Sequence, residues 1–442
     1  MRRSRYIPVL VAAAWSCAAW GQAGRQGRVM TLQECIRQGI EANYDVKLAR
    51  IQRDVADNNV TMSQFLPVVN LNARQNHEAV NTSDHYTSQS TVKNDYATNI
   101  AAADASLSWR LFDGMGMFAT RDRQKELLSQ GELNLRNSIE GLVADIADQY
   151  YYLVTESERL GVHRRYLEIS TLRYNQAQEK YNIGSISGLE MKQAKIDLNA
   201  DSSAYVMQQV LVENAFVQLF RLMNVDYASQ VMLGDTIIPN ERLDLAQLKA
   251  SAIDNNSRIQ MARSGQRVSE IDLRSARAGR YPTLDFVSTY RMNRTSDGSK
   301  QPLYSTLGGL SWGFTASVPL FRGLDFDRRV RNAKLGVQSN ELLYDRTVQS
   351  VTGDMLVQYN TYRRNLAMIG FVSESADVAL LNLEAAMEMY RLGSMSGVEF
   401  REIQRSYLQA EERKLDAMLQ TKTTEINLLY LSGQLLDTPA FK

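Results

Sequence analysis

The sequence has little of what most enzymes and metalloproteins need. Its 442 residues include only three His and two Cys, Cys17 and Cys35, which leaves little material for a metal site, Cys/His catalysis or a disulfide framework. Basic and acidic residues are nearly balanced, 50 against 49, so no positive excess favours nucleic-acid binding. Neither a P-loop nor a dinucleotide-binding glycine motif occurs. We therefore expect no enzymatic activity, no catalytic residues, no cofactor, no metal and no nucleic-acid partner.

Proline and long apolar runs are also scarce. Only 7 Pro occur, while hydrophobic residues make up 44% and charged residues 22% of the chain, and the mean hydropathy is −0.33. This composition suits long amphipathic elements. Beyond the N-terminus, no stretch approaches the roughly 20 uninterrupted apolar residues of a membrane-spanning helix. If the chain enters a membrane after its N-terminus, we expect it to do so with β-strands.

The N-terminus has the pattern of a secretory signal peptide. Three arginines precede an apolar run over residues 6–20, and small residues follow up to Ala23. We predict a signal peptide over residues 1–23, so the protein leaves the cytoplasm. An alternative is lipidation at Cys17, although Ala14 and Trp15 in front of it suit a lipobox poorly.

An internal repeat decides the architecture. The segment YNIGSISGLE at 181–190 recurs as YRLGSMSGVE at 390–399, and LFDG at 111–114 recurs as LFRG at 320–323, both with an offset of 209 residues. Such a constant spacing is typical of a continuous helix, because one inserted residue rotates every later side chain by about 100°. We therefore predict two tandem copies over residues 24–224 and 244–432, separated by residues 225–243 and followed by a tail over 433–442.

Within each copy, apolar residues recur every seven positions over the stretch between these two motifs. This heptad spacing predicts a very long helix in coiled-coil packing. The pattern stops at two Gly-Ser turns, which we predict near 182–188 and 391–397, and resumes beyond them. Each turn is expected to reverse one long helix into an antiparallel partner. The turn glycines are Gly184, Gly188, Gly393 and Gly397.

Four other segments alternate between apolar and polar residues. They predict strands at about 68–77, 100–112, 283–293 and 310–321, each pair joined by a polar stretch, 81–95 or 294–305. Strands of about ten alternating residues fit a membrane barrel with one face toward lipid. The alternative is an antiparallel sheet that covers a soluble core. In a membrane, four strands cannot close a barrel, so several copies would have to contribute to one wall.

The duplicated order, the Leu-Phe-x-Gly strand ends and the Tyr-x-x-Gly-Ser-x-Ser-Gly turns resemble the TolC-like outer-membrane efflux proteins. The resemblance implies a mainly α fold with a β-barrel part, a homotrimer with a 12-stranded barrel embedded in outer-membrane lipid, and a helical tunnel through the periplasm. It also implies a passive exit duct of a tripartite efflux pump or type I secretion system. Its partners would be a periplasmic adaptor and an inner-membrane pump of the RND or ABC type.

The resemblance also assigns roles at the turns. In TolC-like proteins, acidic residues six and nine positions after the turn glycine of the second copy narrow the entrance, and counting from Gly393 this implies Glu399 and Glu402. A latch between the residues that correspond to Tyr390 and Glu190 holds the entrance shut, but the basic residue that joins this latch is Met395 here. A simpler interpretation is that these acids are exposed first-turn residues favoured by the helix dipole.

A second hypothesis belongs to another class of protein. The same heptads could build a periplasmic or surface coiled-coil scaffold that has no conducting lumen. Such a scaffold would be fully soluble, whereas a duct would require detergent for extraction from outer membranes.

Overall fold

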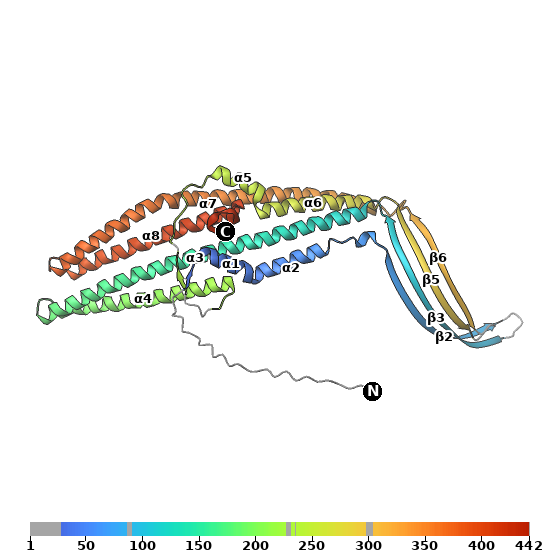
Figure 1. Ribbon diagram of the computed structural model, residues 1–442, viewed down its shortest axis with the longest axis horizontal. Helices are drawn as coiled ribbons and strands as arrows, with labels where there is room; N and C mark the ends of the chain where they lie inside the picture. The colour runs from blue at the N-terminus through green and yellow to red at the C-terminus, as the bar shows by residue number, and fades with distance from the viewer. Residues whose placement is uncertain (1–27, 86–90, 227–230, 235, 298–303, 442) are drawn as a thin grey trace, which may run out of the picture.

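The molecule is a long helical bundle with a β-sheet extending from one end (Figure 1). The computed structural model describes residues 28–85, 91–226, 231–234, 236–297 and 304–441. Two helices, α3 (Gly116–Asn182) and α7 (Asp325–Arg391), have 67 residues each. At 1.5 Å per residue each is roughly 100 Å long, so the predicted rod is confirmed.

The elements repeat in the same order in both halves of the chain. The first set is α1 (Leu32–Ala42), α2 (Tyr44–Asn58), β2 (Val68–His85), β3 (Thr91–Phe112), α3 and α4 (Gly188–Met223). The second set is α5 (Leu245–Asn255), α6 (Ser257–Ala278), β5 (Thr283–Asp297), β6 (Tyr304–Ser317), α7 and α8 (Gly397–Ser432). A short parallel pair, β1 (Arg28–Met30) and β4 (Val231–Leu233), connects the start of the described chain to the segment between the repeats. The predicted mainly helical, duplicated fold with four long strands is confirmed.

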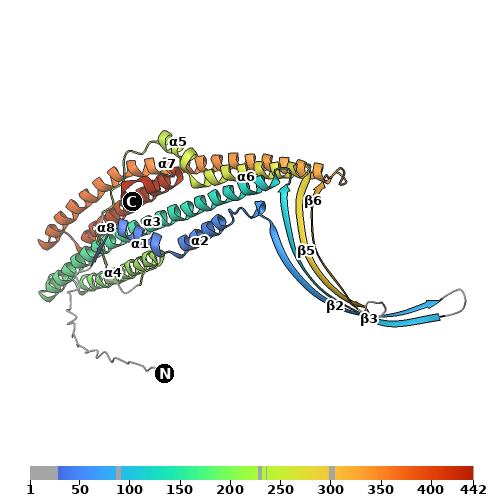
Figure 2. The same ribbon diagram turned by 45° about the vertical axis from the view of Figure 1, so that its right-hand side comes forward.

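The four long strands form one antiparallel sheet in the order β2-β3-β5-β6. Figure 2 shows this sheet curving away from the helices. Its register places Phe286 opposite both Trp109 and Phe314, and Leu107 opposite Val69. Since neighbours in register share a face, the apolar residues of all four strands lie on one side of the sheet.

The other side of the sheet carries the alternate, polar residues. Asp285 lies opposite Arg110 and Thr315 in the register, and the Arg110 guanidinium Nε contacts an Asp285 carboxylate oxygen at 2.9 Å. On the same face, the Asn72 side-chain amide donates a hydrogen bond of 3.0 Å to the Asp104 carboxylate. The sheet therefore has one apolar and one polar face, as the alternation predicts.

The strand bounds differ from those predicted. The ladder between β2 and β3 continues to His85 and Thr91, well into the polar stretch predicted to join the strands, and β5 likewise continues to Asp297. Backbone hydrogen bonds do not require apolar side chains, so the ladder outlasts the alternation on which the prediction rested. Conversely, β6 ends at Ser317, before the predicted end at Phe321, where Pro319 lacks a backbone donor.

Buried apolar side chains hold the bundle together at several levels. The main cluster joins α1, the middle of α3 and the ends of α4 and α8, and Tyr150 at its centre donates a hydrogen bond of 3.1 Å to the Met30 carbonyl. Phe441 is 2% exposed in this cluster, so the described part of the predicted tail packs against the core. The predicted signal peptide, including Cys17, lies outside the described residues.

One of the described helices, α7, is long and apolar enough to cross a membrane by length and composition alone. A helix that packs in a bundle passes the same test, and α7 lies along α6 and α8 (Figure 1).

Candidate functional site at the hairpin ends

Helices α3 and α4 form one antiparallel hairpin and α7 and α8 a second, and their turns lie together at the end of the bundle opposite the sheet (Figure 1). Gly184 and Gly393 adopt φ angles of +75° and +80°, in the left-handed region that glycine enters at little cost. Each ends its long helix as a left-handed C-terminal cap. The structure places all four predicted turn glycines at these two reversals.

The two remaining turn glycines permit a close approach. A Cβ atom on Gly397 would lie 3.2 Å from Glu190 Oε1 and 3.8 Å from Tyr390 Cε2. On Gly188, the same atom would lie 3.3 Å from the Tyr181 ring. Glu190 belongs to the first hairpin and Gly397 to the second, so glycine at 397 lets the two turns meet.

Glu399 forms a capping box at the start of α8. The Ser396 side chain accepts a hydrogen bond from the Glu399 amide, and Glu399 Oε2 accepts from the Ser396 amide at 3.0 Å and from its hydroxyl at 2.9 Å. These bonds to Ser396 hold the pKa of the Glu399 carboxyl below its usual value. Glu402, one turn later, is exposed. The structure therefore gives Glu399 a structural role in addition to any role at an entrance.

Tyr390 is enclosed by both hairpins. It is 4% exposed, and its ring stacks on Phe400 with 5.1 Å between centroids. From the first hairpin, the Lys180 ammonium lies 4.7 Å from the centre of the Tyr390 ring and donates a hydrogen bond of 3.1 Å to its carbonyl. Burial raises the pKa of the Tyr390 hydroxyl, the Arg173 guanidinium beside it opposes this rise, and Glu190 adds to it.

Tyr390 and Glu190 are thus neighbours, as the predicted latch requires. Between these two described residues the structure records electrostatic proximity but no hydrogen bond. Met395, at the position where the family places a basic residue, packs against the apolar cluster around Tyr390. Positive charge reaches this cluster from Lys180 and Arg173 of α3 instead.

Sequence reasoning missed a buried polar network that joins the two hairpins. Arg401 of α8 donates to both carboxylate oxygens of Asp201 of α4, at 2.7 and 2.8 Å. Asp201 also accepts from the Ser170 hydroxyl of α3 at 2.5 Å, and Gln404 donates to Ser170 at 2.7 Å. We call these four residues the hairpin network. Separating the hairpins would leave these buried charges without partners, which is costly, so the network opposes their separation.

Arg173 borders this network and a cavity. Its guanidinium is buried and contacts Asp197 at 2.8 Å through Nη2, whereas Nε and Nη1 have no hydrogen-bond partner among the described residues. The neighbouring cavity has a volume of about 310 Å³ and lies between α3 and the second hairpin, with Arg173, Tyr390 and Phe400 in its wall. The contact between the hairpins is therefore hollowed beside the network.

One sequence signal could have pointed to the network. At the offset of 209 residues, Arg401 corresponds to Lys192 and Asp201 to Ala410. The cation is present in both copies, but the acid Asp201 has no charged counterpart, and such an unmatched charge suggests a local partner. The sequence does not identify that partner, because the contact joins α4 and α8 across 200 residues of chain.

Comparison with known proteins identifies the fold. The family model described as outer membrane efflux protein matches residues 35–225 and 248–434. The efflux pump outer membrane protein TtgC of Pseudomonas putida is 21% identical over 414 residues, covering 91% of this chain and 82% of that protein.

Two solved structures share the fold. The CmeC outer membrane channel of Campylobacter jejuni superposes with a TM-score of 0.77 at 16% identity, covering 97% of this chain and 94% of CmeC. The open state of the MtrE outer membrane channel of Neisseria gonorrhoeae gives a TM-score of 0.70 at 17% identity, covering 91% of this chain and 89% of MtrE.

Proposed function

This chain belongs to the outer membrane efflux protein family, and from that membership we propose that three copies of it form a passive export duct through the outer membrane. The sheet carries this proposal. In the order β2-β3-β5-β6, the outer edges of β2 and β6 are unpaired among the described strands. In hydrocarbon each unpaired backbone group costs several kcal/mol, so the edges must pair with other copies. Three copies would give a closed wall of 12 strands.

The helices support the same assembly. In the half of the bundle next to the sheet, α2 packs on α3, α3 on α6 and α6 on α7. Helices α2 and α7 therefore form the two lateral edges of this half. On α2, the exposed apolar residues Leu48, Ile51 and Val55 follow coiled-coil spacing, and on α7 Leu335 and Leu342 are exposed seven residues apart. Each edge thus offers a stripe that a second copy would cover.

Assembly is tested by mass and circular dichroism of the full chain in detergent. We expect a trimer that is extracted from outer membranes only with detergent. A stable monomer that retains its full β-content would overturn the duct. A fully soluble protein would favour the alternative, a coiled-coil scaffold without a lumen, but the apolar face shared by all four strands already argues against it.

We further propose that Glu399 and Glu402 line the periplasmic entrance. Three chains would bring six of these carboxylates to one axis, favouring cations and multivalent blockers. Both hydrogen bonds to Ser396 use Oε2 of Glu399, which leaves lone pairs on Oε1 for a cation. Glu190 and Tyr390 would act as the latch between the hairpins, with Lys180 and Arg173 supplying the positive charge.

Planar-bilayer recordings test this entrance. Glu399→Gln combined with Glu402→Gln should lower cation selectivity and weaken block by trivalent ions. The control, Glu374→Gln with Asp377→Asn, removes the same charge from exposed positions on α7 away from the turn. If the entrance variant keeps the selectivity and block of the wild type, these acids do not line the aperture.

The turns also offer a surface for an adaptor. Ile183 and Leu189 on the first turn, and Leu392 and Val398 at the corresponding positions of the second, are all exposed apolar residues. We propose that the hairpins of a periplasmic adaptor dock there and connect the duct to an inner-membrane pump of the RND or ABC type. Replacing Leu189 and Val398 with Glu should abolish adaptor crosslinking, while the trimer and its conductance are retained.

A further inference from the structure

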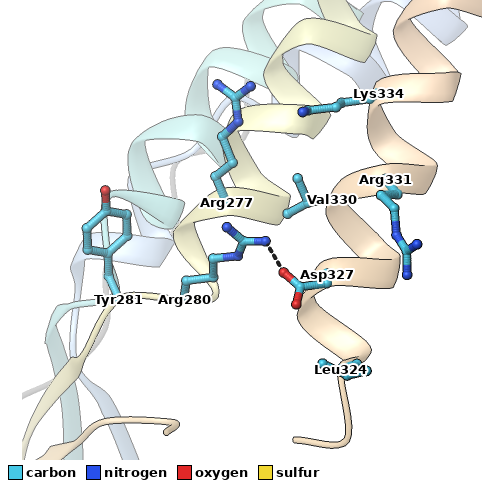
Figure 3. Close-up of a pocket in the computed structure, with 8 residues that line it drawn as sticks. All are labelled: Arg277, Arg280, Tyr281, Leu324, Asp327, Val330, Arg331 and Lys334. Carbon is cyan, nitrogen blue, oxygen red and sulfur yellow. Dashed lines mark hydrogen bonds and ion pairs between the residues drawn. The ribbon is translucent and has the colours of Figure 1, made fainter. Parts of the chain in front are cut away.

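A cationic cavity lies between α6 and α7, close to where the strands meet the helices (Figure 3). Its volume is about 730 Å³. Four of the side chains that line it are basic and one is acidic. The lining consists of Arg277, Arg280, Tyr281, Leu324, Asp327, Val330, Arg331 and Lys334.

Most of this positive charge is uncompensated. Arg280 forms an ion pair with Asp327, the only acid in the lining. Arg277, Arg331 and Lys334 form no ion pair with any residue in the described part of the chain. Figure 3 shows Lys334 extending from α7 toward Arg277 on α6. Two like charges that approach each other across a cavity favour an anion between them.

The internal repeat indicates that this cavity opens on the same side of the protomer as the apolar face of the sheet. Asp327 corresponds to Phe118 of the first copy at the offset of 209. Phe118 packs on Phe65 with 5.1 Å between ring centroids, and the Phe65 carbonyl accepts a hydrogen bond of 2.9 Å from Trp109. Trp109 belongs to the apolar face, so Phe118 lies on that side, and we assign Asp327 to the same side.

Exposed apolar side chains occur in the lining itself and in the segment of chain that joins β6 to it. Leu320 and Phe321 are 92% and 78% exposed, and Leu324 and Tyr281 in the lining are also exposed. A cavity with basic side chains next to exposed apolar ones matches an amphiphile with a negative head and an apolar tail. A free inorganic anion would make no favourable contact with these apolar side chains.

The corresponding position of the first copy carries different side chains. Where the second copy has Arg280 and Asp327, the first has the Phe65–Phe118 contact. The next acid along α3, Asp122, is paired with Arg274. The Arg280–Asp327 pair of the second copy is therefore replaced by an aromatic contact in the first.

We infer that this cavity binds the phosphate of an anionic phospholipid from the periplasmic leaflet of the outer membrane. The inference rests on the proposed membrane orientation, in which the end of the strands next to the helices marks the periplasmic boundary. Arg277 and Lys334 hold the phosphate, the Arg280–Asp327 pair keeps α6 and α7 in register, and Leu320 with Phe321 contacts the acyl chains. A trimer has three such sites, one at each α6–α7 junction.

Native mass spectrometry of the detergent-solubilised full chain, titrated with phosphatidylglycerol, tests the inference. Arg277→Gln combined with Lys334→Gln should weaken lipid binding by roughly 25-fold, about fivefold for each cation at a membrane surface. Arg277→Lys combined with Lys334→Arg should restore it. The control is Arg121→Gln with Lys125→Gln, which removes two cations at the corresponding level of the first copy and should leave binding unchanged.

Two further arms separate the outcomes. Excess inorganic phosphate should not displace the lipid; if phosphate binds equally well by itself, the cavity is a free-anion site and the inference is overturned. Equal losses in the Arg277/Lys334 variant and the control would overturn it as well. The same spectra report the oligomer, so a monomer would contradict the proposed duct, whereas trimers that bind lipid regardless of the variant contradict only this inference.

Discussion

The two hairpin turns have almost the same sequence and very different surroundings. Tyr181 and Tyr390 occupy the same position in their repeats, yet Tyr181 is 43% exposed and Tyr390 only 4%. Tyr390 is covered by Lys180 and Arg173 of the other hairpin in the same chain. Among the described residues, no side chain of the other hairpin covers the ring of Tyr181 in this way. The first turn therefore faces outward from the protomer, where the proposed trimer would place the next copy.

This difference indicates where the proposed entrance would be restrained. Arg401 and Asp201 link the two hairpins within one chain, and their repeat counterparts, Lys192 and Ala410, cannot form the same ion pair with a neighbouring chain. In the proposed trimer, buried charge would therefore link the two hairpins of one chain, and the contact between neighbouring chains would lack this ion pair. If the proposed entrance opens by outward movement of the second hairpin, that hairpin must first break contacts with its own chain.

The largest expected effect comes from removing this buried charge. Arg401→Met leaves Asp201 buried without its partner, which should cost about 3–5 kcal/mol and raise conductance by freeing the second hairpin. Lys192→Met, the exposed counterpart, should change little. The measurements are the thermal dissociation midpoint of the detergent-solubilised trimer and the single-channel conductance.

A double variant separates loss of the ion pair from general damage. Arg401→Met combined with Asp201→Leu removes both charges and should recover part of the lost thermal stability, because no uncompensated charge remains. If Lys192→Met lowers the midpoint as much as Arg401→Met does, the contacts within and between chains are alike and the comparison fails.

At the sheet the two repeats should behave alike. Phe314→Arg places a charge on the apolar face and should cost roughly 2–4 kcal/mol if the residue lies near the bilayer midplane. Ala105→Arg, at the corresponding position of the first copy, should be similarly costly. Thr315→Arg points to the polar face and should chiefly alter conduction. The yield of assembled trimer in the outer membrane measures all three, and equal tolerance of Phe314→Arg and Thr315→Arg would contradict the assigned faces.

The contrast between sheet and turns also separates what sequence could predict from what it could not. The constant offset of 209 located both reversals, because a continuous helix tolerates no insertion. Alternation assigned Phe314 and Thr315 to opposite faces, because strand geometry has a period of two. Both are local rules. The extension of β2 to His85 followed backbone pairing instead, which leaves no trace in side-chain polarity.

The hairpin network lay beyond sequence reasoning for another reason. Arg401 is one of many charged residues on a long helix, and its counterpart Lys192 is exposed as such residues usually are. Burial of Arg401 depends on how α8 approaches α3 and α4, which are distant in sequence. Family resemblance supplied Tyr390 and Glu190 as neighbours, but the basic partners, Lys180 and Arg173, come from α3 and not from the position of Met395.

A smaller effect is expected from a single hydroxyl at the two turns. Tyr390→Phe removes a hydroxyl that lies close to Arg173 and Glu190, and this should weaken the electrostatic contact between the hairpins. Single-channel conductance in planar bilayers should therefore rise. Tyr181→Phe changes an exposed ring and should leave conductance as in the wild type. Equal conductance of Tyr390→Phe and the wild type would remove Tyr390 from the latch.

The smallest expected effect distinguishes the two helix starts beyond the turns. Ser187 caps α4 by accepting from the Glu190 amide at 3.3 Å, whereas Ser396 caps α8 as part of a complete capping box with Glu399. Ser396→Ala should cost about 1 kcal/mol of local helix stability, and Ser187→Ala less, since Glu190 turns toward Gly397 and not back to its cap. Amide hydrogen exchange in the first turn of each helix, corrected for intrinsic rates, measures both.

The pH dependence of that exchange tests the cause. Ser396 lowers the pKa of Glu399 in the folded chain, so Glu399 contributes stability that is present above its ordinary pKa of 4.5 and is lost as the pH falls through the lowered value. Protection of the first turn of α8 should therefore decline in acid, while that of α4 should not follow the same course. Glu399→Gln should remove the pH dependence and keep much of the cap, because glutamine can also accept from the Ser396 amide. If Glu399→Gln leaves the acid decline in place, another group titrates there, and the difference between the two turns does not arise from the capping box.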